Sequence, residues 1–223
     1  MEKALLYKEW LKTRRVFFAA LVLAVALACY AVLMMNRLIE LKGVDHLWLI
    51  MLMKDNTFID IIKYSPLAIG IAIGAAQMVP EMTQKRLKLT LHLPYPQQRL
   101  VMLMLMSGLA ELLLIFVIQL AILVVYDFTI LPHELVWRVA LTTLPWYFAG
   151  LTAYLYVTAI CLEGKWRMRV ILALLAVATL MIFFLQPVPE AYNGMTLLLV
   201  IFMILLTILS FGSVIRFKEG RQD

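Results

Sequence analysis

The chain alternates long apolar runs with short polar segments. A helix needs about 20 mostly apolar residues to cross the roughly 30 Å hydrocarbon core of a bilayer. Backbone groups in lipid must bond within their own segment, and the alternation expected of barrel strands is absent. We therefore predict an all-α polytopic membrane protein with six transmembrane helices. The apolar windows lie at residues 16–35, 64–80, 100–126, 136–162, 170–186 and 195–215.

Residues 1–15 carry more charge than the run that follows them. Leu6, Tyr7, Trp10 and Leu11 fall on one side at helical spacing, and Lys8, Glu9, Lys12 and Arg15 fall on the other. This pattern predicts an N-terminal amphipathic helix lying at the membrane interface. A plain basic flank to the first span is the alternative. The apolar run after it is too long for a signal peptide and is followed by no small-residue cleavage site, which indicates an uncleaved first span.

Two features between the first and third windows bear on packing. Residues 47–53 are apolar but too few to cross a bilayer, so we expect them to lie in the interface or to pack on the bundle. Gly70 and Gly74 stand four residues apart in the second window. A stripe of small residues lets helices approach closely. We therefore expect these two glycines to lie at a helix contact.

Composition strengthens the membrane interpretation. Of the 223 residues, 64% are hydrophobic and 15% are charged, whereas a soluble domain is about half apolar and a quarter charged. Little chain remains outside the apolar windows, so no separate catalytic domain is expected. Cys29 and Cys161 fall within or at the end of predicted spans at different depths, and we expect them to be unpaired.

Loop charge predicts the orientation. With the N-terminus inside, most lysines and arginines fall on cytoplasmic segments, as the positive-inside rule requires. We therefore predict both termini in the cytoplasm and a location in the inner (cytoplasmic) membrane. The same asymmetry accounts for the net charge of +6 without nucleic-acid binding. The predicted organisation is one transmembrane domain over 1–223, with an interfacial helix at 1–15, six spans within 16–215 and a cytoplasmic tail at 216–223. Lys42, Lys54, Lys63, Arg37 and Arg138 are left on the outer side.

The sequence contains no recognisable catalytic constellation. A glycine-rich phosphate loop followed by Lys-Ser or Lys-Thr is absent, so ATP is not expected to bind in that way. His46, His92 and His133 lie in connections, which disfavours a haem or an intramembrane metal site. We predict that the chain is not an enzyme and that it holds no metal or cofactor.

Polar residues inside the third span are the candidate pathway. Ser107, Glu111 and Gln119 lie at spacings of four and eight, so they share one helix face. A carboxylate at the bilayer centre costs about 2.5–3.5 kcal/mol, so we expect Glu111 to face the protein interior. It either contacts a substrate or proton, or bonds a neighbouring helix, and the sequence leaves both open.

The cytoplasmic connection at 80–96 reads PEMTQKRLKLTLHLPYP. Its leucine spacing predicts a short amphipathic helix parallel to the membrane, ended by Pro94. The segment resembles the first cytoplasmic loop of type-2 ABC transporter permeases, in which an acid precedes Gly-Thr-Leu-Glu-x-Leu-Leu-x-x-Pro. The matching residues are Glu81, Leu87, Leu91 and Pro94. Lys85, Arg86 and Lys88 stand where that pattern has glycine, threonine and glutamate.

This resemblance, which extends to the basic N-terminal helix and six spans, implies a permease subunit. In that family a separate ABC ATPase subunit binds ATP, and two permease halves form the pathway. It implies that residues 81–93 couple to the ATPase, that a second half (a homodimer or a similar chain) and membrane lipid are the other partners, and that the subunit exports its substrate. The implied coupling residues are Glu81, Lys85, Arg86, Leu87, Lys88, Leu91 and Pro94. The alternatives are a standalone proton-coupled secondary transporter using Glu111, and a structural membrane subunit without a pathway.

Overall fold

The computed structural model of the chain describes residues 2–53, 55, 57–83, 97–185 and 188–206. These residues form helices and turns, with no strand among them, so the prediction of an all-α protein is confirmed for this part of the chain. The elements are α1 (Glu2–Lys42), α2 (Val44–Met53), η1 (Asp60–Ile62), α3 (Ser65–Thr83), α5 (Gln97–Asp127), α6 (His133–Leu162), α7 (Trp166–Ile182) and η2 (Asn193–Met195).

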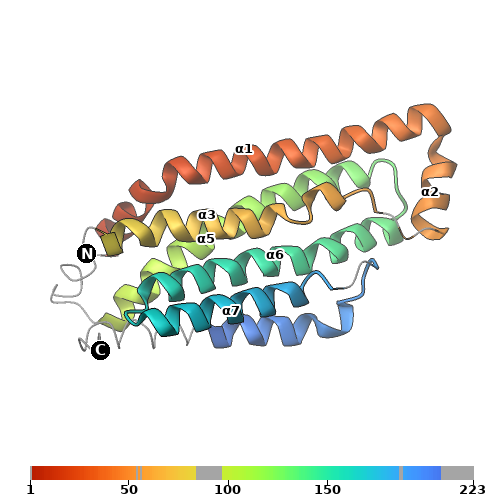
Figure 1. Ribbon diagram of the computed structural model, residues 1–223. Coiled ribbons are helices and arrows are strands. Elements are labelled where there is room, and N and C mark those ends of the chain that lie inside the picture. Colours follow the sequence, from red (N-terminus) through yellow and green to blue (C-terminus); the bar gives the residue numbers. More distant parts are fainter. Residues whose placement is uncertain (1, 54, 56, 84–96, 186–187, 207–223) are drawn as a thin grey trace.

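The long helices form an elongated bundle (Figure 1). α3 packs most extensively on α6, α1 lies along α5, and α7 covers another side of α6. The N-terminus, the end of α3, the start of α5 and the α6–α7 turn lie at one end of the bundle, on the left of Figure 1. We call this the N-terminal end. The short helix α2 lies at the opposite end.

Four helices are long and apolar enough to cross a membrane, at Glu2–Lys42, Asp60–Thr83, Arg99–Asp127 and His133–Leu162. The described residues are therefore compatible with a membrane-embedded protein. Two more predicted windows correspond to shorter apolar helices: α7, with 17 residues, and the helical segment Asn193–Leu206. The last predicted window, 195–215, continues beyond the described residues.

The separate interfacial helix predicted for residues 1–15 is not found, because α1 runs unbroken from Glu2 to Lys42. One stripe of α1 is buried along most of its length, at spacings of three and four. The prediction had placed Glu9 on the polar side of the helix, opposite Leu6 and Trp10. In the structure Glu9 and Thr13 instead belong to the buried stripe, which packs on the bundle and consists largely of alanines. Its members are Glu9, Thr13, Phe17, Ala20, Ala24, Ala28, Ala31 and Met35.

Glycines set the contact between α3 and α6. A Cβ atom at Gly70 would lie 2.0 Å from the carbonyl oxygen of Gly150, and one at Gly150 would lie 2.5 Å from the carbonyl oxygen of Pro66. A Cβ at Gly74 would meet side chains and no backbone atom, with Val157 at 3.1 Å and the Tyr154 ring at 3.4 Å. The two glycines singled out in the sequence therefore face α6 of the same chain.

The apolar segment between the first two long helices forms α2. Leu47 and Met51 are buried in a cluster with Ile59 and with Leu135 and Val139 of α6. The segment therefore packs on the bundle, as one of the expectations had it.

Candidate functional site

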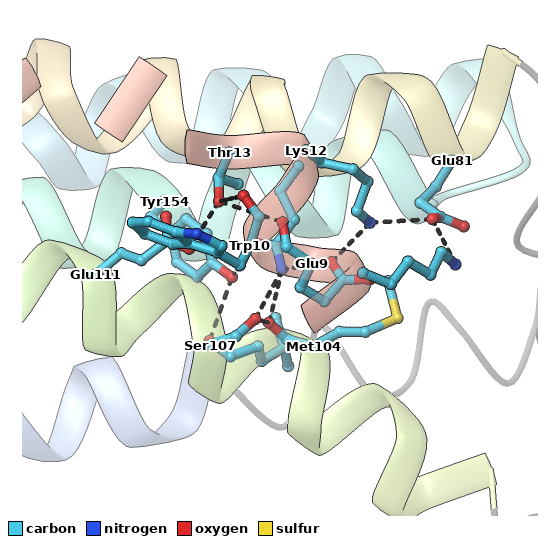
Figure 2. Close-up of polar contacts among 12 residues, drawn as sticks. Glu9, Trp10, Lys12, Thr13, Glu81, Met104, Ser107, Glu111 and Tyr154 are labelled. Carbon is cyan, nitrogen blue, oxygen red and sulfur yellow. Dashed lines mark hydrogen bonds and ion pairs between the residues drawn. The ribbon is translucent and has the colours of Figure 1, made fainter. Parts of the chain in front are cut away.

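A buried polar cluster joins four helices near the N-terminal end of the bundle (Figure 2). Its polar side chains come from segments far apart in the sequence, and most are buried. Polar groups at such a position are costly unless they bond one another. The cluster consists of Lys8, Glu9, Lys12 and Thr13 of α1, Gln77 and Glu81 of α3, Ser107 and Glu111 of α5, and Tyr154 of α6.

Ion pairs connect the beginning of α1 to the end of α3. The Nζ atom of Lys12 lies 2.6 Å from Glu9 Oε2 and 3.0 Å from Glu81 Oε1. The Nζ atom of Lys8 lies 2.8 Å from the same oxygen of Glu81. Glu9 and Glu81 are 1% and 0% exposed. Since removal of one partner from a buried ion pair leaves an uncompensated charge, these contacts tie the two helix ends together.

Gln77 links the ion pairs to α5 and α6. Its amide nitrogen lies 2.9 Å from Glu9 Oε2, 3.2 Å from Ser107 Oγ and 2.7 Å from the Met104 carbonyl oxygen. The hydroxyl group of Tyr154 donates to the amide oxygen of Gln77 at 2.7 Å. The amide of Gln77 therefore has partners on α1, α5 and α6.

A glycine makes room for this arrangement. A Cβ atom at Gly108 would lie 2.3 Å from the hydroxyl oxygen of Tyr154 and 2.6 Å from Gln77 Oε1. A side chain on α5 at this point would therefore displace the bond between Tyr154 and Gln77.

The three candidate pathway residues have different surroundings. Ser107 joins the cluster through Gln77. Glu111 accepts a hydrogen bond of 2.6 Å from the Thr13 hydroxyl. Gln119 lies further along α5, where its amide nitrogen donates to the Ala24 carbonyl oxygen at 3.1 Å. All three therefore bond to α3 or α1.

The carboxylates of the cluster retain bonding capacity. Glu9, Glu81 and Glu111 each have one buried oxygen without a hydrogen-bond partner among the described residues. The ion pairs involve the first two, whereas Glu111 contacts the Thr13 hydroxyl (Figure 2) and no lysine among the described residues. Glu111 is thus the acid of the cluster whose charge is not matched by a lysine.

Of the coupling residues inferred from the resemblance, only Glu81 is described. Its carboxylate turns into the bundle, toward α1, rather than away from it (Figure 2). If this segment docks on another subunit, Glu81 affects the docking only indirectly, by fixing the position of α3. The others, Lys85, Arg86, Leu87, Lys88, Leu91 and Pro94, lie outside the described residues.

The sequence analysis missed the contribution of α1. The sequence signal was present, because Glu9 and Thr13 lie eight and four residues before Phe17, which starts the apolar part of the buried stripe. Tyr154, Gly108 and Gly150 were not singled out. Nothing in a single sequence connects them to Gln77 or Gly70.

The cluster ties four helices together and holds charged groups inside the bundle. Among the described residues no group of His, Cys, Asp and Glu side chains is arranged to hold a metal ion. Cys29 and Cys161 are unpaired. No protein-family model, curated protein or solved structure matches this chain.

Proposed function

We propose that the chain is the membrane-spanning permease subunit of an ATP-driven ABC exporter. In this proposal it is not itself an enzyme: a separate ATPase subunit binds and hydrolyses ATP, and a second permease half completes the pathway. Residues 81–93 couple the two kinds of subunit. The observation that carries the proposal is the buried polar cluster. It joins the end of α3, where the segment resembling a coupling loop begins, to three other helices.

The position of the cluster supports a coupling role. α3 ends at Thr83 and α5 begins at Gln97, and both of these helix ends lie at the N-terminal end of the bundle (Figure 1). A displacement of the intervening segment acts directly on the last turn of α3. Glu81 passes it to α1 through two lysines, and Gln77 passes it to α5 and α6. Coupling between distant sites needs such a contiguous set of contacts.

The proposal includes six crossings with both termini in the cytoplasm of a cell and the inner membrane as its location. Basic residues belong to segments at the N-terminal end of the bundle (Figure 1), in agreement with the positive-inside rule. Arg14 and Arg15 belong to the first third of α1, Arg99 to the first turn of α5, and Lys165 and Arg167 to the α6–α7 turn and the start of α7. α7 and Asn193–Leu206, which lies in the predicted window 195–215, supply the fifth and sixth crossings.

The orientation has a direct test. In a chain whose native Cys29 and Cys161 are replaced by alanine, single cysteines at Glu2 and Asp45 are expected to differ. An impermeant thiol reagent applied to intact cells should label Asp45→Cys, in α2, and leave Glu2→Cys unlabelled until the membrane is opened. Labelling of Glu2→Cys in intact cells would reverse the proposed orientation.

The coupling role predicts a loss of partner binding without a loss of insertion. In the double variant Leu87→Asp, Leu91→Asp, docking of the segment onto an ATPase loses two leucine side chains that would contribute about 1.5–3 kcal/mol each if buried. We expect co-purification of an ATP-hydrolysing subunit to fall at least tenfold, and transport with it. The charge variant Lys88→Gln should have a smaller, salt-dependent effect.

A matched control places the same change at the opposite end of the bundle. Leu41→Asp with Leu52→Asp alters two leucines that are already exposed, so both insertion and ATPase binding should persist. If no ATPase accompanies even the unaltered chain, or transport survives in the Leu87, Leu91 variant, the coupling proposal fails.

That second outcome would favour a standalone proton-coupled transporter. The observation behind this candidate is Glu111, a buried acid that no lysine of the cluster pairs with. In that case transport would follow an imposed proton gradient, and Glu111→Gln would abolish this dependence.

A further inference from the structure

A groove of about 400 Å³ opens between the ends of α3, α6 and α7 at the N-terminal end of the bundle. Most of its lining is apolar, and several lining side chains are partly exposed on the outside of the bundle. α3 contributes Val79 and Met82, α6 contributes Ile160, and α7 contributes Trp166 and Arg169. The groove is separate from the polar cluster, which lies between α1, α3, α5 and α6.

A single guanidinium group lies within this apolar lining. The Nε atom of Arg169 donates to the Glu163 carbonyl oxygen at 2.6 Å, which fixes the side chain beside the α6–α7 turn. Its two terminal nitrogens have no hydrogen-bond partner among the described residues. Lys165 and Arg167 in the same turn add positive charge. The groove therefore offers a positive site with two free donor groups at one end of an apolar channel.

The surroundings of Arg169 are typical of a membrane boundary. Trp166, at the start of α7, is 73% exposed, and exposed tryptophans gather where hydrocarbon meets headgroups. Beyond it, Val170, Leu174 and Val177 form an exposed apolar surface along α7. One end of the groove thus suits a headgroup, and its walls continue into a surface that suits acyl chains.

We propose that the groove binds an anionic phospholipid, with an acyl chain against Val79, Ile160 and Val170 and the phosphate on Arg169. Arginine binds phosphate oxygens through two parallel hydrogen bonds, and basic pockets between transmembrane helices bind anionic headgroups. A free phosphate would leave the apolar walls in contact with water. A zwitterionic lipid such as phosphatidylcholine also carries a phosphate, but its choline cation would lie beside the positive charges of Arg169, Lys165 and Arg167, so a lipid with net negative charge is favoured. The inference requires only membrane embedding and stands whether or not an ATPase binds the chain.

The charge requirement is tested on the purified full chain in detergent by native mass spectrometry, with phosphatidylglycerol and phosphatidylcholine added in equal amounts. We expect at least fivefold more bound phosphatidylglycerol for the unaltered chain and less than twofold for Arg169→Gln. Arg14→Gln is the matched control, since Arg14 is an exposed arginine of α1 outside the groove, and it should keep the preference. Equal binding of both lipids by the unaltered chain, or equal losses in the two variants, would overturn the proposal.

A second variant tests the groove without changing charge or the Arg169–Glu163 contact. Ala173 lines the groove and is exposed, so Ala173→Phe fills the space without crowding the interior. Brominated phosphatidylglycerol should quench Trp166 fluorescence, measured as the difference from Trp166→Phe, at least threefold more than brominated phosphatidylcholine. In Ala173→Phe this difference should disappear while the thermal unfolding midpoint stays unchanged. Unaltered selective quenching in Ala173→Phe would exclude the groove as the binding site.

Discussion

Replacing Glu81 with glutamine is expected to destabilise the chain by about 3 kcal/mol, near the lower end of the cost of breaking a buried ion pair. The carboxylate is fully buried and lies within 3.0 Å of both Lys8 and Lys12. The lower end applies because Lys12 retains Glu9, and the side chain of Lys8 is 32% exposed and can turn to water. The measurement is equilibrium unfolding of the purified chain in mixed micelles of a mild detergent and SDS.

Two further variants identify the ion pair as the cause. Glu40→Gln makes the same chemical change on an exposed part of α1 and should stay within about 0.5 kcal/mol of the unaltered chain. Combining Glu81→Gln with Lys12→Met should cost less than the two single changes added together, because each single change already breaks the Glu81–Lys12 pair and the double variant loses it only once. Strict additivity would show that Glu81 and Lys12 do not interact.

Replacing Gly70 with alanine is expected to be as severe, at or above the upper end of the roughly 1–3 kcal/mol typical of overpacking. The added methyl group would meet the backbone of Gly150 at 2.0 Å. A backbone atom cannot rotate away, so α3 and α6 must separate. Their separation would also pull Gln77 from Tyr154 and weaken the polar cluster. Unfolding in mixed micelles and loss of transport are the two readouts.

The other glycines provide a graded comparison. Gly74→Ala would meet a valine side chain at 3.1 Å, which can shift, so its effect should be clearly smaller. Gly194→Ala would meet nothing within 4 Å and should be near neutral. Equal effects at Gly70 and Gly194 would contradict the close contact. Because α6 of the same chain occupies this face, the loss should appear in the fold of one chain rather than only in its association with a second.

The apolar windows predicted the helices well because a bilayer-length run of apolar residues has few other uses. The windows beginning at residues 64, 100 and 136 correspond to α3, α5 and α6, with ends displaced by a few residues. The second window was expected to stop at Pro80, but α3 continues to Thr83 with Pro80 inside it. The following turn of α3 holds Glu81 at the ion pair with α1, and that tertiary contact cannot be read from a local proline.

The polar cluster was only half predicted. Glu111 and Ser107 stood out because polar groups are rare inside an apolar run. Glu9 and Lys12 did not, because a charged segment next to a span is usually solvated or interfacial. Their burial depends on which face of α1 meets α3, and the stripe of alanines further along the same helix determines that face. Gly150 could not be paired with Gly70 without knowing that α3 and α6 are neighbours.

For a chain embedded in a membrane, the unequal exposure of the long helices has a consequence for biogenesis. α1 and α5 are the most apolar of the four long helices and are largely exposed, whereas α6 is mostly covered by protein and α3 is intermediate. A nascent α1 or α5 can therefore leave the insertion machinery and remain alone in lipid. α6 is less apolar, so its insertion into lipid without a protein partner costs more free energy. α3 is synthesised earlier and provides the surface on which α6 packs. The glycine contact thus provides a rule of assembly order, in which α3 must be in place before α6 is released.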